Sequence, residues 1–195
     1  AEALKTNGYT TFVAGKWHLG PSEELFPRGQ GLDLDIGGWA RGGPYTGKKY
    51  FAPFENPQME VESPEGEHLP ARLARDTAEF IEANKDQPFL AYYPMNLVHD
   101  MAGGGIPTTP VDGIPGSNKG GSLQGLVEYI DILVGRLMEG LETAGLRENT
   151  IVIFTCDNGE NGKKMHASED GSRVPFIVNC PGLIQQRGAT DELME

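Results

Sequence analysis

The sequence is poor in cysteine and in basic residues, and it has no long apolar run. Two cysteines in 195 residues are too few for a disulfide-stabilised small domain, and their spacing does not fit a Cys/His metal site. Lysine and arginine total 16 against 28 aspartates and glutamates, a formal net charge of −12. This balance argues against nucleic acid or an anionic membrane surface as a partner. No apolar segment approaches the roughly 20 residues of a membrane span, so we expect no span here.

The length and the two ends of the sequence bear on its domain organisation. A chain of 195 residues can bury one good core, so one domain or a large piece of one is expected. The first residues have the pattern of a helix end before Gly8, and the last residues that of a helix start. We therefore expect the sequence to be an internal piece of a longer protein. A leader peptide would lie outside it, so the location of the protein is not predicted from the residues.

The apolar pattern predicts an α/β fold with a doubly wound, mostly parallel sheet and helices on both faces. Near-continuous apolar runs are typical of strands buried on both faces. Such runs cover residues 10–16, 88–94, 150–156 and 173–178. Apolar residues at three-four spacing predict helices over 69–84 and 123–144. The segments 21–67 and 100–121, rich in glycine and proline, are predicted to be long loops, which in compact domains are usually functional or form a small subsite.

Polar side chains follow three of the predicted strands. They are Lys16 and His18 after the first, His99 after the second, and Asp157, Asn158 and the Lys163–Lys164 pair after the third. In open α/β sheets, sites form outside the carboxyl ends of the strands. Lys16 and His18 are alternate residues, so in an extended backbone they would point to the same side, with Trp17 facing the packing. We therefore predict one site at this edge of the sheet.

The residue types limit the chemistry of such a site. Asp157 and Asn158 offer oxygen donors, which suit a hard cation, calcium or magnesium. Lysines and histidines gathered around that cation suit a highly charged oxyanion, such as a phosphate or sulfate ester. Transfer of such a group is catalysed mainly by positioning and by charge neutralisation.

Four segments resemble the type I sulfatases of the alkaline phosphatase superfamily. Residues 8–20, GYTTFVAGKWHLG, match every fixed place of the second sulfatase signature. Residues 69–99, 126–159 and 163–182 resemble, in the same order, the family segments that contain Val-His, Asp-Asn-Gly and Arg-Val-Pro. The resemblance implies that residues 1–195 are an incomplete sulfatase catalytic domain with an alkaline-phosphatase-like fold. Segments 21–67 and 100–121 would be its variable loops on the substrate side.

The resemblance also implies roles for the residues at the predicted edge. Lys16 would bind a sulfate oxygen, and His18 would contact the nucleophile and take part in releasing sulfate from it. His99 would bind the sulfate and protonate the leaving alcohol. Asp157 and Asn158 would complete a calcium site, with magnesium less favoured.

Further family positions fall near the end of the chain. Counting back from Arg173 places the second sulfate-binding lysine on Lys164, with its neighbour Lys163 as the alternative. Glu169 and Arg173 would be structural partners that hold the loop together.

The family nucleophile is a formylglycine made from the first residue of Cys/Ser-x-Pro-x-Arg. Neither Cys156 nor Cys180 is followed by that pattern, and no serine is, so we expect the nucleophile upstream of this sequence. A formylglycine-generating enzyme would then be a maturation partner, and the piece alone would be inactive. By family resemblance the protein would be periplasmic or secreted.

The substrate would be a sulfated small molecule or glycan. Trp39, Tyr45 and Tyr50 are candidates for stacking on sugar rings, or else for packing in the core or at the rim. Two other functions stay open from the sequence. One is a phosphate or phosphonate ester hydrolase of the same superfamily, and the other a non-catalytic domain that binds a sulfated glycan or only a cation.

Overall fold

The computed structural model describes residues 1–38, 40, 50–54, 56, 58–59, 63–98, 123–159, 167–185 and 188–190. The chain forms two compact units, Ala1–Ala144 and Gly145–Glu195, and each is described by itself. The predicted loop at 100–121 lies outside the described residues, as does part of the loop at 21–67.

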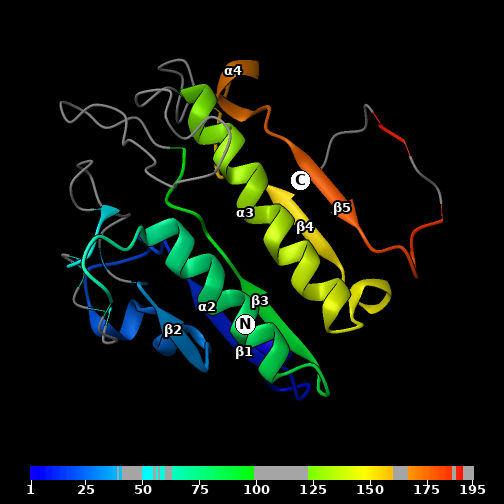
Figure 1. The fold of residues 1–195 in the computed structure, drawn as a ribbon, viewed down its shortest axis with the longest axis horizontal. Coiled ribbons are helices and arrows are strands. Elements are labelled where there is room, and N and C mark those ends of the chain that lie inside the picture. The colour runs from blue at the N-terminus through cyan, green and yellow to red at the C-terminus, as the bar shows by residue number, and fades with distance from the viewer. Residues whose placement is uncertain are drawn as a thin grey trace. The chain divides into compact units, whose positions relative to one another are not determined.

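The first unit is built on a parallel three-stranded sheet in the order β2-β1-β3 (Figure 1). The central strand β1 (Thr10–Ala14) pairs with β2 (Leu34–Ile36) on one side and with β3 (Phe89–Tyr92) on the other. Four of the five β1 residues are buried, as expected for the middle strand of a parallel sheet. The strands predicted at 10–16 and 88–94 are therefore confirmed, with shorter bounds.

Two long helices complete this unit. Helix α2 (Leu69–Ala83) packs against β1 and β3, and helix α3 (Leu123–Thr143) packs against α2 (Figure 1). Phe80 of α2 stacks on Phe12 of β1, with ring centroids 4.6 Å apart, and meets Phe89 of β3 edge to face. A short helix, α1 (Glu2–Lys5), precedes β1. The predicted helices at 69–84 and 123–144 are confirmed to within one residue.

The segment after β1 contains regular structure that the sequence pattern did not predict. It forms two short 3-10 helices, η1 (Glu23–Leu25) and η2 (Pro27–Gln30), and then strand β2. Asp33 ties the start of β2 to β1, because its Oδ2 accepts bonds from the Thr11 amide at 3.0 Å and the Thr11 hydroxyl at 2.9 Å. Lys5 pairs with Asp33 at 2.6 Å, and these bonds, that of Lys5 first, lower the Asp33 pKa to about 2.

The second unit contains η4 (Arg147–Asn149), β4 (Val152–Thr155), α4 (Glu169–Ser172) and β5 (Phe176–Asn179). Strands at 150–156 and 173–178 are confirmed in position. However, β4 and β5 pair antiparallel, and all four β5 residues are exposed, where burial on both faces was predicted. The prediction of burial was wrong because an apolar run fits either pairing direction and does not say what covers the strand.

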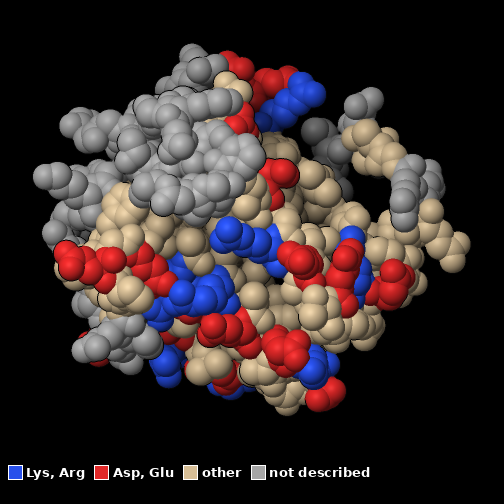
Figure 2. Space-filling model, viewed as in Figure 1, with Lys and Arg blue, Asp and Glu red and all other residues tan. Residues whose placement is uncertain are grey.

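The described surface carries charges of both signs. Figure 2 shows acidic and basic side chains next to one another. Two residues after α2, Lys85 Nζ lies 2.5 Å from Glu82 Oε1 of that helix, and Arg75 of α2 pairs with Glu67, whose side chain is 12% exposed. An exposed pair such as Lys85–Glu82 stabilises a protein little. None of the described helices is long and apolar enough to cross a membrane.

Candidate functional site

The chain leaving β1 is fixed at the carboxyl edge of the sheet. The Gly15 amide donates to the Ile36 carbonyl of β2 at 2.9 Å, and the Lys16 amide donates to the Pro94 carbonyl after β3 at 2.8 Å. Gly15 has a φ of +128°, and a Cβ added there would lie 2.2 Å from the Pro94 oxygen. Only glycine fits such a position. Lys16 therefore starts from the strand edge where the sequence placed it.

His18 departs from the expected extended geometry. Strand β1 ends at Ala14, and the φ of His18 is +61°, in the left-handed region. The alternation of an extended strand therefore does not set the relative directions of Lys16 and His18, and that argument was wrong. Trp17 is half-buried, and its indole Nε1 donates to the Leu25 carbonyl at 2.7 Å. The His18 side chain is exposed.

Two buried tyrosines hold the segment that leaves β3. Tyr93 donates its hydroxyl to the Pro70 carbonyl at 3.1 Å, and Tyr50 donates to the Asn96 carbonyl at 2.8 Å. Tyr50 is 1% exposed, so it packs in the core and does not face a sugar. Burial raises the pKa of both hydroxyls above its usual value.

Three of the residues named from the sequence lie outside the described residues. His99 follows the anchored segment in sequence but lies outside the described residues. Trp39 and Tyr45, the other two candidates for stacking on sugar, lie outside them as well.

The second unit carries the candidate metal ligands. Asp157 and Asn158 come directly after Cys156, which follows β4. The Asn158 side-chain amide donates to the Gly159 carbonyl at 2.8 Å, and the Gly159 amide donates to the Gly171 carbonyl at 2.9 Å. This loop is thus held against α4, with both oxygen-bearing side chains at the carboxyl end of β4.

No complete metal centre is found within the described part of the chain. Among those residues, no group of three or more His, Cys, Asp or Glu side chains could hold a metal ion. The two candidate lysines, Lys163 and Lys164, lie outside them. Of the predicted cation ligands, Asp157 and Asn158 both lie among the described residues of the second unit.

The predicted partnership of Glu169 and Arg173 is confirmed. Their side chains form an ion pair across the single turn of α4, with Arg173 Nη1 2.9 Å from Glu169 Oε1. Both side chains are about three-quarters exposed, so the pair adds little to the stability of the fold.

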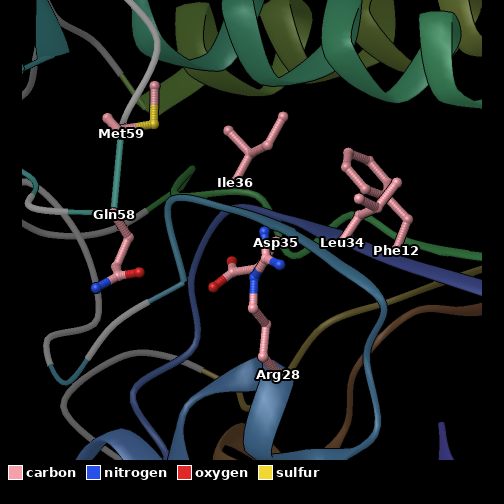
Figure 3. Close-up of a pocket in the computed structure, with 7 residues that line it drawn as sticks. All are labelled: Phe12, Arg28, Leu34, Asp35, Ile36, Gln58 and Met59. Carbon is pink, nitrogen blue, oxygen red and sulfur yellow. The ribbon is translucent and has the colours of Figure 1, made fainter.

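A pocket of about 210 Å³ lies beside β1 and β2 (Figure 3). Its lining residues are Phe12, Arg28, Leu34, Asp35, Ile36, Gln58 and Met59. Arg28 and Asp35 are the two charged residues of this lining. Asp35 Oδ1 also accepts the Gly38 amide at 3.0 Å, which shapes the turn after β2. None of the residues predicted to act on a substrate lines this pocket.

Comparison with known families decides the relationship of the chain. The family model described as Sulfatase matches residues 1–195. The chain belongs to the sulfatase family. The resemblance drawn from the four sequence segments is therefore confirmed.

Individual sulfatases match nearly all of this chain. The ulvan-active sulfatase of Formosa agariphila is 29% identical over 224 residues, covering 97% of this chain and 42% of its own length. Human arylsulfatase A is 30% identical over 230 residues, covering 99% of this chain and 44% of its own length. The chain thus spans about two fifths of the length of these curated relatives.

A solved structure supports the fold class. Ps i-CgsB in complex with k-i-k-neocarrahexaose superposes with a TM-score of 0.69 at 24% identity, covering 92% of this chain and 46% of that one. The predicted α/β class with an alkaline-phosphatase-like sheet is confirmed by this likeness and by the parallel strands of the first unit.

Sequence reasoning missed a buried cluster around His68, the residue before α2. His68 Nδ1 lies 3.2 Å from the Tyr129 hydroxyl of α3, and its ring stacks on Tyr50 with centroids 6.0 Å apart. No described residue forms a hydrogen bond with His68 Nε2. Burial lowers the His68 pKa to about 4. The partners lie far apart in the chain, so no local signal could reveal the cluster.

A second buried group was also missed. Arg72 Nε lies 2.7 Å from Asp76 Oδ2, one turn along α2, and the two side chains are 4% and 8% exposed. Burial raises the Asp76 pKa although Arg72 acts in the opposite direction. The i,i+4 spacing was visible in the sequence, but such pairs are mostly exposed, so their burial could not be expected.

Proposed function

We propose that the full-length protein is a sulfatase that hydrolyses a sulfate ester of an aryl or carbohydrate substrate. The observation that carries this proposal is the placement of Lys16. Its amide is bonded to the segment after β3, and Gly15 is bonded to β2, so the lysine of GKWHLG starts from the sheet edge where sites form. Membership in the sulfatase family supports the same reaction.

Four side chains of this chain would act on the ester. The Lys16 ammonium would bind a sulfate oxygen and neutralise the negative charge that develops on the group, and Lys164 would be the second lysine with this role. His99 would bind the sulfate and give a proton to the leaving alcohol oxygen. His18 would contact the nucleophile and take part in the release of sulfate.

The proposal includes calcium, held in part by Asp157 and Asn158. A carboxylate and an amide oxygen are donors that calcium prefers over nitrogen or sulfur, so the donor chemistry fits. Calcium takes 6–8 oxygen ligands, so the remaining donors would come from outside the described residues. The bound ion would add positive charge beside the sulfate and the nucleophile. A chelator should therefore abolish activity, added calcium should restore it, and Asp157→Ala should prevent the restoration.

The nucleophile would come from outside these 195 residues. Cys156 Sγ lies 3.2 Å from the Asn158 carbonyl, and Cys180 is buried with Sγ 3.6 Å from the Glu148 carbonyl. Neither cysteine is followed by x-Pro-x-Arg. We propose a formylglycine supplied by an upstream segment and made by a formylglycine-generating enzyme. Its hydrated aldehyde would supply the oxygen that attacks sulfur, as the family resemblance implies.

The substrate class rests on the relatives. One is named for its activity on ulvan and another as an arylsulfatase, and a structural neighbour was solved with an oligosaccharide. We propose a sulfated glycan or an aryl sulfate for this protein, and a periplasmic or secreted location by the same family resemblance.

The test uses the full-length protein coexpressed with a formylglycine-generating enzyme. Hydrolysis of 4-nitrophenyl sulfate and 4-nitrophenyl phosphate is compared by release of 4-nitrophenol. We expect the sulfate ester to be the better substrate, and Lys16→Ala to lower kcat/KM for it by about 10²–10³-fold, the size found for one charge-stabilising donor.

Lys85→Ala is the matched control. This lysine is exposed just after α2 and pairs only with Glu82 among the described residues, so its removal should leave turnover unchanged. Full activity of a folded Lys16→Ala protein would contradict the role of Lys16. A preference for the phosphate ester would favour the phosphate ester hydrolase, and no turnover of either ester by the mature protein would contradict hydrolysis.

A further inference from the structure

One residue contacts the chain on both sides of His18. The Trp17 indole Nε1 donates to the Leu25 carbonyl at 2.7 Å. On the other side, Gly20 lies so close to Leu25 that a Cβ added to it would be 2.4 Å from Leu25 Cδ1. We call Trp17, Gly20 and Leu25 the Leu25 clamp. Leu25 ends η1, and its own amide is bonded to the Ser22 carbonyl at 3.0 Å.

The clamp encloses a residue with an uncommon backbone. His18 has a φ of +61°, and it is the one described non-glycine residue with a positive φ. A side chain in this region costs about 1–3 kcal/mol and persists only where the surrounding structure enforces it. Gly20 has a φ of +149°, which an L side chain rarely adopts. The clamp is thus well placed to enforce the turn at His18.

Lys16 is held by different bonds. Its amide donates to the Pro94 carbonyl, and the preceding Gly15 donates to the Ile36 carbonyl. These bonds belong to the sheet edge and involve none of the clamp residues. Loss of the clamp should therefore release His18 while Lys16 keeps its place.

We propose that Trp17 is a positioning residue that holds His18, but not Lys16, in its working place through the bond to Leu25. The inference rests on the proposed function, since it takes the role of His18 from there. Trp17 itself touches no substrate in this scheme. Its effect passes through the backbone turn at His18.

The test replaces Trp17 by phenylalanine in the full-length, matured protein. Trp17→Phe keeps an aromatic ring and removes the N–H donor. We expect kcat for 4-nitrophenyl sulfate to fall about 10–100-fold, since a displacement of about 1 Å can have that effect. The inhibition constant of inorganic sulfate, which reports on Lys16 together with the other proposed sulfate ligands, should stay within about twofold of wild type. Glu23→Gln, an exposed change in the same short helix as Leu25, is the control and should alter neither quantity.

A second variant approaches the clamp from its other side. Gly20→Ala adds the Cβ that would meet Leu25. It should likewise lower kcat and leave the inhibition constant of sulfate unchanged. Unchanged kcat in both variants would overturn the inference. An equal loss of turnover and of sulfate binding would overturn it too, because that pattern indicates general damage.

Hydrogen–deuterium exchange separates this inference from the proposed function. Amides of residues 17–20 should exchange faster in Trp17→Phe than in wild type, while those of residues 15 and 16 should not. Wild-type protein without sulfatase activity would contradict the proposed function alone. Exchange unchanged at 17–20 would contradict the clamp, whatever the activity.

Discussion

The burial of His68 predicts that acid destabilises the first unit. His68 has an ordinary pKa of 6.5, which burial lowers to about 4 in the folded protein. Above pH 6.5 the imidazole is neutral in both the folded and the unfolded state, so its titration contributes nothing. Between pH 6.5 and 4 the unfolded chain binds a proton that the folded protein does not. Stability therefore falls as the pH falls, and the effect levels off below pH 4.

The size of the effect follows from the two pKa values. At pH 5.0 the unfolded imidazole is almost wholly protonated and the folded one almost wholly neutral. Because each pKa unit is worth about 1.4 kcal/mol, the free energy of unfolding should drop by about 2 kcal/mol between pH 7.5 and pH 5.0 through His68 alone. The absence of any described partner for Nε2 agrees with a neutral ring.

The assay is urea denaturation of the full-length protein at pH 7.5 and pH 5.0. Other groups titrate in this range, so the quantity compared is the pH-induced change in wild type minus that in His68→Gln. The glutamine side chain can also form a hydrogen bond with the Tyr129 hydroxyl, and it carries no titrating proton. We expect this difference to be about 2 kcal/mol, since the variant lacks the His68 contribution.

Tyr129→Phe is the matched control. It removes the hydroxyl that lies 3.2 Å from His68 Nδ1 and keeps the histidine buried. It should lower stability at pH 7.5 by about 1 kcal/mol and keep the wild-type dependence on pH. The reasoning is refuted if His68→Gln and wild type lose the same free energy between the two pH values.

Two further predictions concern stability and use urea denaturation at pH 7.5. Arg72→Leu leaves the buried Asp76 carboxylate with no ion-pair partner among the described residues closer than Arg75 Nε at 3.9 Å, and should cost about 3–5 kcal/mol, against less than about 1 kcal/mol for the half-exposed Arg75→Leu; equal losses would contradict the burial of the first pair. Gly15→Ala combines left-handed strain with a contact of 2.2 Å to the Pro94 oxygen and should cost about 2–5 kcal/mol; an unchanged midpoint would contradict the geometry at the end of β1.

The helices and the first strands could be predicted because their signals are local. Apolar residues at three-four spacing were enough to bound α2 and α3 to within one residue. Strand β2 was missed because it has three residues and lies in a segment rich in turns. The burial of β5 was predicted wrongly, since burial depends on what packs against a strand and not on the strand alone.

The residues of the candidate site also include some that could be predicted from the sequence and some that could not. The place of Lys16 follows from a rule about strand ends, so the sequence was sufficient. The turn at His18 was not predictable, because its φ depends on contacts with a residue seven positions later in the chain. The pairing of His68 with Tyr129 joins residues 61 positions apart, and no sequence pattern encodes it.

The stretch GKWHLG therefore combines two different tasks in six residues. Gly15 and Gly20 fit the backbone against Pro94 and Leu25, and Trp17 bonds to Leu25. In the proposed function, Lys16 and His18 are the two residues of this stretch that meet the sulfate and the nucleophile. Lys16 follows Gly15, which is fitted to the sheet edge, whereas His18 lies between Trp17 and Gly20, which both contact Leu25. A change at a supporting residue can thus disable one side chain while the other keeps its chemistry intact.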